Sequence, residues 1–265
     1  MSEQHFTKIV SDAKPLAEEV CLHLMGEPLA HPEFASMLAI CGEVGVKVQL
    51  TSNGLLIAKH QDTLLASQAL RQINFSLQSF KDNFPHRPLE GYLAPLLEFA
   101  KLASIKRPEL YINLRLWNVG ADNADNEEIF RFIEQYFNIQ IKRAVDVGGK
   151  KSKKIWNKLY LHFDSRFEWP SLALPFQSDH GKCHALTGHI GIHADGTVVP
   201  CCLDKEAKVN LGNCLERSLP EIMNGERAVK MKEGFAKGIL VEELCKHCSY
   251  INRFKKTAGV HAQKA

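Results

Sequence analysis

The chain has 265 residues, of which 45% are hydrophobic and 24% charged, as is ordinary for a soluble globular protein. This length suits one large domain with or without a small appendage, and a net charge of +3 is too weak to indicate binding to DNA. No stretch approaches the roughly 20 apolar residues of a membrane span, and the polar N-terminus lacks the apolar core of a signal peptide. Eight cysteines without an export signal predict a cytoplasmic protein that uses thiolates as ligands.

Helices and strands are predicted to alternate from residue 1 to about 145. The expected order is a helix capped by Ser2, a strand over 19–24, a helix after Pro32, a strand over 46–51, and helix–strand units at 64–70 and 73–77, 89–102 and 110–117, and 127–136 and 139–145. Such alternation builds a parallel sheet whose functional residues gather at the C-terminal ends of the strands. Because a β/α series should open with a strand, the leading helix indicates that a first strand and its loop, roughly 25–30 residues, are absent. A helix that caps the sheet edge is the alternative.

The alternation stops after residue 145. Residues 151–182 are expected to be a long connection, and the basic run from Lys150 to Lys154 to be a solvated loop or a surface for an anionic partner. A hairpin is predicted over 189–200, with Gly196 in its tight turn. A capping box at Ser218 and Glu221 predicts a helix to about residue 232. The predicted segments are therefore 1–150, 151–182 and 183–265.

Four cysteines form the most specific pattern in the chain. Cys183 is followed by twelve residues, Gly196, four more residues and Cys201, and the pair Cys245 and Cys248 follows the predicted helix. Four thiolates can bind one tetrahedral metal ion or one iron–sulfur cube. Zinc ribbons usually bring two Cys-x₂-Cys pairs, so an iron–sulfur cluster is favoured over structural zinc and over unrelated buried cysteines. Cys202 is an alternative to Cys201, although the spacing from Gly196 favours the latter.

The stretch from Cys183 to Cys248 resembles the C-terminal module of radical S-adenosylmethionine enzymes called SPASM, or twitch in its shorter form. The family pattern is a Cys, nine to fifteen residues, Gly, four residues and Cys, followed by further cysteines. Only Cys245 and Cys248 represent that later part, so the resemblance implies one auxiliary [4Fe–4S] cluster with Cys183, Cys201, Cys245 and Cys248 as ligands.

The first half of the chain resembles the same family. Met25-Gly26-Glu27-Pro28 is similar to its Gly-Gly-Glu motif, with Met25 in place of the first glycine. The resemblance implies that Gly26 and Glu27 bind the amino group of S-adenosylmethionine, an ammonium that needs acceptors. It also implies cofactor contacts from Asn53, from Ser76 and Gln78 at the ribose, and from Arg115 at the carboxylate or adenosine.

One departure concerns the Cys-x₃-Cys-x₂-Cys loop that follows the first strand of the family and binds the cluster that cleaves S-adenosylmethionine. The sequence contains no such motif, so a second [4Fe–4S] cluster is expected only if a preceding segment exists. The expected fold is a partial (β/α)₆ barrel without its first strand, followed by a SPASM or twitch module.

The resemblance implies an oxidoreductase or maturase, inactive as written, that acts on a small molecule or peptide and receives electrons from a flavodoxin or ferredoxin. The alternatives are a non-catalytic degenerate barrel with one cluster used for electron transfer or stability, and a zinc-stabilised binding module.

Overall fold

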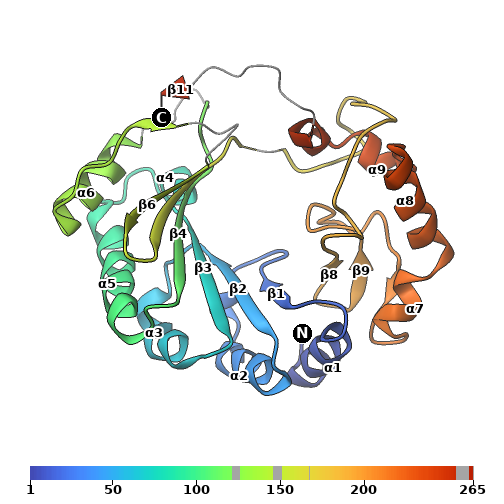
Figure 1. Ribbon diagram of the computed structural model, residues 1–265, viewed down its shortest axis with the longest axis horizontal. Coiled ribbons are helices and arrows are strands. Elements are labelled where there is room, and N and C mark those ends of the chain that lie inside the picture. The colour runs from blue at the N-terminus through green and yellow to red at the C-terminus, as the bar shows by residue number, and fades with distance from the viewer. Residues whose placement is uncertain (121–125, 146–150, 167, 255–262, 265) are drawn as a thin grey trace. The chain divides into compact units, whose positions relative to one another are not determined.

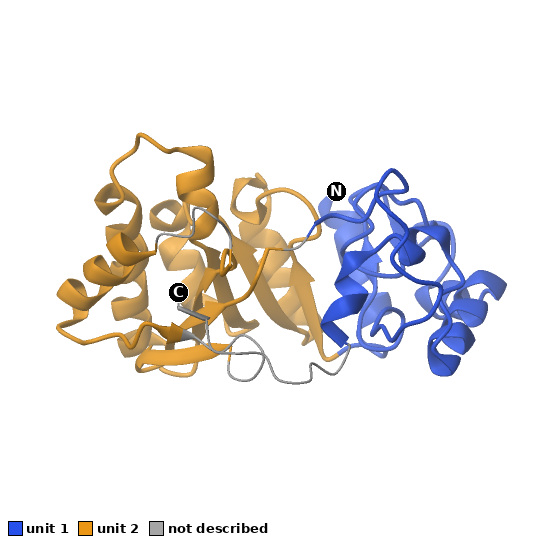
Figure 2. Cartoon of the chain, turned by 90° about the horizontal axis from the view of Figure 1, so that it is seen from above, with its two compact units in different colours: residues 1–17, 167–258 blue, residues 18–166, 259–265 orange. Residues whose placement is uncertain are grey.

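The computed structural model describes residues 1–120, 126–145, 151–166, 168–254 and 263–264. The chain forms two compact units (Figure 2), one made of residues 1–17 and 167–258 and the other of residues 18–166 and 259–265. This division differs from the three predicted segments in two ranges. Residues 1–17 belong to the C-terminal unit rather than to the barrel segment, and residues 151–166 belong to the sheet unit rather than to a connection. Among the described residues, no helix has the length and apolar content that a membrane crossing requires.

The sheet unit, residues 18–166, is built on six strands in the order β1-β2-β3-β4-β7-β6 (Figure 1). Strands β1 to β4 and β7 run parallel, and β6 pairs with β7 in the antiparallel direction. The predicted α/β fold with a parallel sheet is confirmed. The strand bounds are β1 Glu19–Leu22, β2 Lys47–Ser52, β3 Leu70–Ser76, β4 Tyr111–Leu116, β6 Ser152–Trp156 and β7 Leu159–Phe163.

The strand predicted over 139–145 is wrong. Only Ala144–Val145 is extended (β5), and it pairs with β11 (Gln263–Lys264) in a separate two-stranded sheet. The next parallel strand is β7, in the stretch predicted to be a connection, and the basic run partly lies in its neighbour β6. Strand β7 alternates buried Leu159, Leu161 and Phe163 with polar residues, which is the pattern of a strand with one buried face.

The two faces of the sheet differ in chemistry. Leu50, Ile73, Leu114 and Leu161 are fully buried, and the helices α2, α3, α5 and α6 flank one side of the sheet (Figure 1). The strand residues that alternate with these leucines and isoleucine point to the other face and are largely polar. Their side chains form a hydrogen-bonded row across the strands, made of Glu19, Gln49, Gln72, Asn74 and Asn113. The sheet therefore has one apolar face and one polar face whose side chains hydrogen-bond to one another.

The helices of this unit include the four that were predicted, one of them with a shifted start, and two short helices that were not predicted, η1 and α4. They are η1 Pro28–Ala30, α2 Phe34–Val44, α3 Ile57–Ala66, α4 Gln78–Asn83, α5 Glu90–Lys106 and α6 Glu127–Phe137. The helix predicted over 64–70 begins earlier and ends at Ala66, because Leu70 already pairs with Val48 as part of β3.

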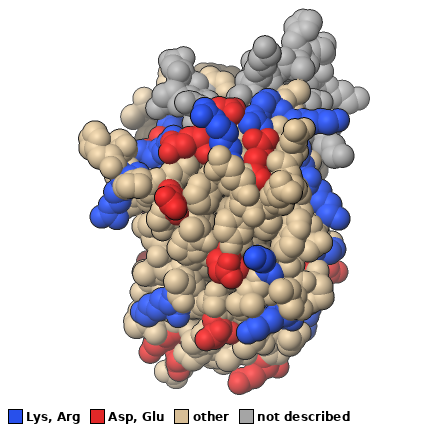
Figure 3. All heavy atoms as spheres, turned by 90° about the vertical axis from the view of Figure 1, so that its left-hand side faces the viewer, with Lys and Arg blue, Asp and Glu red and all other residues tan. Residues whose placement is uncertain are grey.

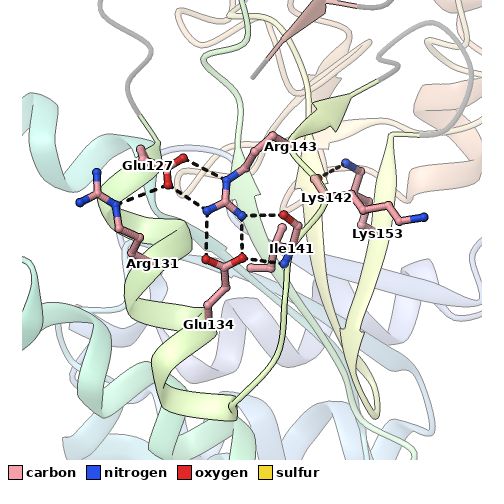
Figure 4. Close-up of polar contacts among 7 residues, drawn as sticks. All are labelled: Glu127, Arg131, Glu134, Ile141, Lys142, Arg143 and Lys153. Carbon is pink, nitrogen blue, oxygen red and sulfur yellow. Dashed lines mark hydrogen bonds and ion pairs between the residues drawn. The ribbon is translucent and has the colours of Figure 1, made fainter.

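Arg143 ties the segment after α6 to that helix (Figure 4). Its guanidinium donates to both carboxylates of Glu127 and Glu134 at 2.7–3.0 Å and to the Ile141 carbonyl at 2.6 Å. These bonds raise the pKa of Arg143, and the bond from Arg143 lowers the pKa of Glu134 to about 2. Figure 3 shows basic and acidic side chains intermixed on this side of the molecule.

The C-terminal unit contains a three-stranded antiparallel sheet, β10-β9-β8, and short helices. The predicted hairpin is confirmed, with Gly196 at φ +87° in its turn. The capping box of Ser218 and Glu221 is also confirmed, but the helix it begins ends at Met223, and a second helix follows from Glu226 with Gly225 as its N-cap. The bounds are β8 Gly191–Ile192, β9 Thr197–Val199, β10 Gly212–Asn213, α7 Leu219–Met223, α8 Glu226–Lys237, α9 Glu243–Lys246 and η2 Ser249–Phe254.

Helix α1 (Glu3–Ala13) belongs to this same unit. Ser2 caps it, as predicted, by accepting a hydrogen bond from the His5 N–H. Ile9 lies in the hydrophobic core that contains Val198 and Leu219, and the Lys8 ammonium donates to the Cys214 carbonyl at 2.6 Å. The packing partners of the leading helix are therefore in the C-terminal unit, although the sequence pattern put it at the start of the β/α series.

Candidate functional site

The structure brings together the four cysteines predicted as ligands. Cys183 precedes β8, Cys201 follows β9, Cys245 lies in α9 and Cys248 comes just after it, and all four are half-buried. Burial raises the pKa of Cys201 to about 12, with added contributions from the neighbouring thiols of Cys202 and Cys183. Burial likewise raises the pKa of Cys245 and of Cys248, and each of these is also coupled to Cys183.

This thiol cluster has the chemistry of a cationic cofactor site. Neighbouring buried thiols oppose each other's ionisation, because each thiolate would be a like charge in a poorly solvated place. Iron ions supply the positive charge that stabilises thiolates, so metal binding would reverse the raised pKa values. The donor set fits a [4Fe–4S] cluster, which takes one cysteine per iron. Across the described residues, no three His, Cys, Asp or Glu side chains are arranged as ligands of a single metal ion.

The surroundings distinguish Cys201 from its neighbour Cys202. Cys201, Cys183 and Cys245 pack against the core of the C-terminal unit, whereas Cys202 is exposed. Cys245 is electrostatically coupled to Cys201, while the coupling of Cys202 is to Cys201 and Cys183. Both observations favour Cys201 as the ligand.

Local packing holds the backbone near these thiols. A Cβ at Gly191 would lie 2.7 Å from a Val199 methyl and 3.1 Å from the Cys201 carbonyl oxygen, so β8 can approach β9 this closely only with glycine there. On the other side, the His247 ring contacts the Leu174 carbonyl at 2.5 Å, and the Gln177 N–H donates to the Lys246 carbonyl at 2.8 Å. The Cys245–Cys248 loop is therefore tied to the chain segment 174–177.

A second cluster of predicted residues lies at the C-terminal ends of β1 and β2. The Glu27 carboxylate accepts hydrogen bonds from the Ser52 hydroxyl at 2.8 Å, the Asn53 N–H at 2.7 Å and the Leu29 N–H at 3.1 Å. Ser52 is buried, and its hydroxyl accepts from the Gly54 N–H at 2.9 Å. Glu27 therefore joins the turn after β1 to the turn after β2.

The other predicted cofactor residues lie on neighbouring strands. Gly26 has φ +91°, and a Cβ there would point into open space. Ser76 ends β3 and pairs in register with Arg115 on β4. Gln78 begins α4, and its Oε1 is buried with no hydrogen-bond partner in the described part of the chain. An unsatisfied buried amide oxygen is a site where a ligand donor would be favourable.

Arg115 on β4 reaches across to β2, the strand whose following turn is bonded to Glu27. Its guanidinium donates to the Thr51 hydroxyl at 3.3 Å and lies 4.6 Å from the Trp117 ring centroid. Burial lowers its pKa to about 10, and no ion pair to it is found among the described residues. A half-buried cation without a carboxylate partner is suited to bind an anionic group.

Sequence reasoning missed two histidines on the polar face of the sheet. His23 follows β1, its Nδ1 is buried without a partner within the described residues, and burial lowers its pKa to about 4 with help from Arg115. His162 on β7 accepts a hydrogen bond from the Trp117 indole at 2.8 Å. For His23, a signal was available, because Cys21 and His23 alternate with apolar residues at the end of a predicted strand. For His162 there was none, because strand β7 was not predicted.

Comparison with known proteins finds a matching domain for part of the chain and similar folds for most of it. Residues 183–249 match the SPASM family, an iron–sulfur cluster-binding domain. No curated protein matches the chain as a relative. Among solved structures, Streptococcus suis SuiB matches with a TM-score of 0.57 at 17% identity, over 94% of this chain and 67% of SuiB.

Two further structures have the same fold. BtrN in complex with AdoMet and 2-DOIA matches with a TM-score of 0.53 at 14% identity, over 99% of this chain and 86% of BtrN. The protein anSMEcpe with bound AdoMet matches with a TM-score of 0.52 at 16% identity, over 96% of this chain and 76% of that one.

The fold is thus similar to that of SuiB, BtrN and anSMEcpe. Residues 183–249 match the SPASM domain, and the predicted resemblance to proteins of the radical S-adenosylmethionine type with a SPASM module is confirmed at the level of this domain and of the fold.

Proposed function

We propose that the chain is the cluster-bearing part of a radical S-adenosylmethionine oxidoreductase or maturase that acts on a peptide. The observation that carries this proposal is the proximity of Cys183, Cys201, Cys245 and Cys248 within the SPASM domain. The peptide substrate is supported by SuiB, which is solved with precursor peptide SuiA, and by anSMEcpe, which is solved with the Cp18Cys peptide.

Each candidate residue has a role that follows from its surroundings. Glu27, fixed by the turns after β1 and β2, accepts hydrogen bonds from an ammonium group, and the open space at Gly26 admits that group to the backbone. Arg115 pairs with a carboxylate, while Asn53, Ser76 and Gln78 offer neutral polar atoms beside it. The four cysteines hold one auxiliary [4Fe–4S] cluster, which when bound supplies a one-electron acceptor or donor.

The chain by itself is expected not to cleave S-adenosylmethionine. Its 265 residues contain no Cys-x₃-Cys-x₂-Cys, the motif that holds the cleaving cluster in the family it resembles. The second candidate function is therefore a non-catalytic one, in which the auxiliary cluster serves electron transfer with a flavodoxin or ferredoxin. It is favoured by the same absence of the motif.

The first experiment is metal and sulfide analysis of protein purified without oxygen, together with electron paramagnetic resonance of the reduced sample. We expect about four iron and four sulfide per chain and the spectrum of one reduced cubane. Cys201→Ser is expected to lose most of the iron, whereas its matched control Cys202→Ser keeps it, because Cys202 is exposed and lies outside the core contacts.

Two outcomes would count against the proposal. Stoichiometric zinc without sulfide would indicate a structural metal site. Equal iron content in both variants would mean that Cys201 is not a ligand. A separate assay for S-adenosylmethionine cleavage tests the expected lack of activity, which turnover by this chain would contradict.

A further inference from the structure

The sheet unit contains a cavity of about 340 Å³ beside the Glu27 site. Its lining comes from the turn after β2 and from the short helix after β3, namely Asn53, Leu55, Ser79, Phe80, Asn83 and Phe84. This volume is at the lower end of the range for small-molecule sites, which run from roughly 300 to 1,000 Å³. The cavity therefore has room for a group the size of one amino-acid residue.

The walls of this cavity are apolar on one side and fixed in place. The Phe80 ring stacks on Tyr92 with centroids 4.0 Å apart, and the Phe84 ring lies 4.4 Å from the Arg87 guanidinium. Leu55, 44% exposed, adds an aliphatic surface. Because Tyr92 and Arg87 each cover part of a ring, the rings are held where an apolar ligand would meet them.

The polar lining is neutral and partly unused. Asn53 accepts the Leu55 N–H through Oδ1, and Asn83 donates through Nδ2 to the Ser79 carbonyl at 2.7 Å. No hydrogen bond within the described residues uses Asn53 Nδ2 or Asn83 Oδ1, which leaves one donor and one acceptor. A peptide backbone presents the complementary acceptor and donor at each residue. The six described residues that line the cavity are all uncharged, so a charged ligand group would find no ion-pair partner among them.

We infer that this cavity is a subsite for one residue of a peptide with a bulky, uncharged apolar side chain, an inference that rests on the peptide substrate proposed above. The side chain packs against Leu55, Phe80 and Phe84, and the backbone pairs with Asn53 and Asn83. The Asn53 N–H also donates to Glu27, so one turn lines this subsite and supports the candidate cofactor residue. A peptide bound here lies next to the cofactor site.

The test uses N-acetyl-L-phenylalaninamide as the probe and nuclear magnetic resonance of the full chain as the readout. We expect shifts of the Leu55 methyl and Asn83 amide signals that saturate in the millimolar range. N-acetyl-L-alaninamide should bind about tenfold more weakly or worse, because it lacks the ring that is buried. N-acetyl-L-glutamate amide should cause no saturable shift.

Variants separate the subsite from general surface binding. Leu55→Trp fills the cavity and should weaken the phenylalanine probe at least tenfold, while Leu172→Trp, at an exposed leucine in the other unit, should leave it unchanged. Asn83→Ala should weaken the probe without abolishing its preference over the alanine probe.

The inference is overturned if the three probes bind alike, if none shifts these signals up to its solubility limit, or if both tryptophan variants behave alike. It is also overturned if S-adenosylmethionine saturates the same signals and displaces the probe, because the cavity would then belong to the cofactor. Iron content is measured on the same samples, so a missing cluster and a missing subsite are distinguished.

Discussion

Replacing Glu27 with alanine should loosen the turn after β2 without unfolding the sheet unit. The carboxylate accepts three hydrogen bonds, at 2.7, 2.8 and 3.1 Å, two of them from the backbone N–H groups of Asn53 and Leu29. A hydrogen bond to a charged group contributes about 1.5–3 kcal/mol, and contributions within one network do not add fully. We therefore expect Glu27→Ala to lower the opening free energy of this turn by about 3 kcal/mol.

The assay is amide hydrogen exchange at Asn53 and Gly54, measured under conditions in which exchange reports local opening. Glu27→Gln should have a smaller effect, about 1–2 kcal/mol, because its one carbonyl oxygen can accept from Asn53 while its amide donates to the Ser52 hydroxyl. Glu43→Ala, at an exposed glutamate on α2, is the control and should change exchange by less than about 0.5 kcal/mol. If Glu27→Ala matched that control, the carboxylate would not be what organises the turn.

Three further predictions concern pH and packing. The pKa of Glu134 is lowered to about 2, so its stabilising bond to Arg143 is complete above about pH 4.5 and lost as the pH falls towards 2; acid titration of unfolding should show this in the wild type and not in Arg143→Met. The pKa of His23 is lowered to about 4, so the folded state loses stability as the pH falls from 6.5 towards 4, and His23→Leu should flatten that part of a stability–pH curve. Gly54→Ala should cost about 1–3 kcal/mol in urea unfolding, because φ is +80° and the new Cβ would lie 2.7 Å from a Leu96 methyl, whereas Gly91→Ala, with nothing within 4 Å, should be neutral or stabilising.

Local signals in the sequence predicted much of the fold. The cap at Ser2, the hairpin turn at Gly196 and the capping box at Ser218 each depend on neighbouring residues, and all three are present in the structure. The candidate metal ligands were found for a different reason, because cysteine spacing around a glycine turn is specific even when the intervening fold is not known.

The errors arose where tertiary contacts decide. Ile139–Val145 has the composition of a strand, but the Arg143 network and the burial of Ile141 hold the segment against α6 instead. Strand β7 was not predicted, because the preceding lysines and the tight turn before it are typical of a loop. The cavity at Phe80 and Phe84 lies between the turn after β2 and helix α4. Sequence spacing alone does not predict that these two segments lie side by side.

The place of α1 has a consequence for how the SPASM domain can be studied alone. Residues 1–17 and 167–258 form one compact unit with Ile9 in its core, so in chain order residues 18–166 lie between the two parts of that unit. A fragment that started at residue 167 would expose the apolar surface that Ile9 normally covers, and it would be prone to aggregate. During synthesis this core can close only after residues 167–258 have been made, whereas the sheet formed by residues 18–166 can form first.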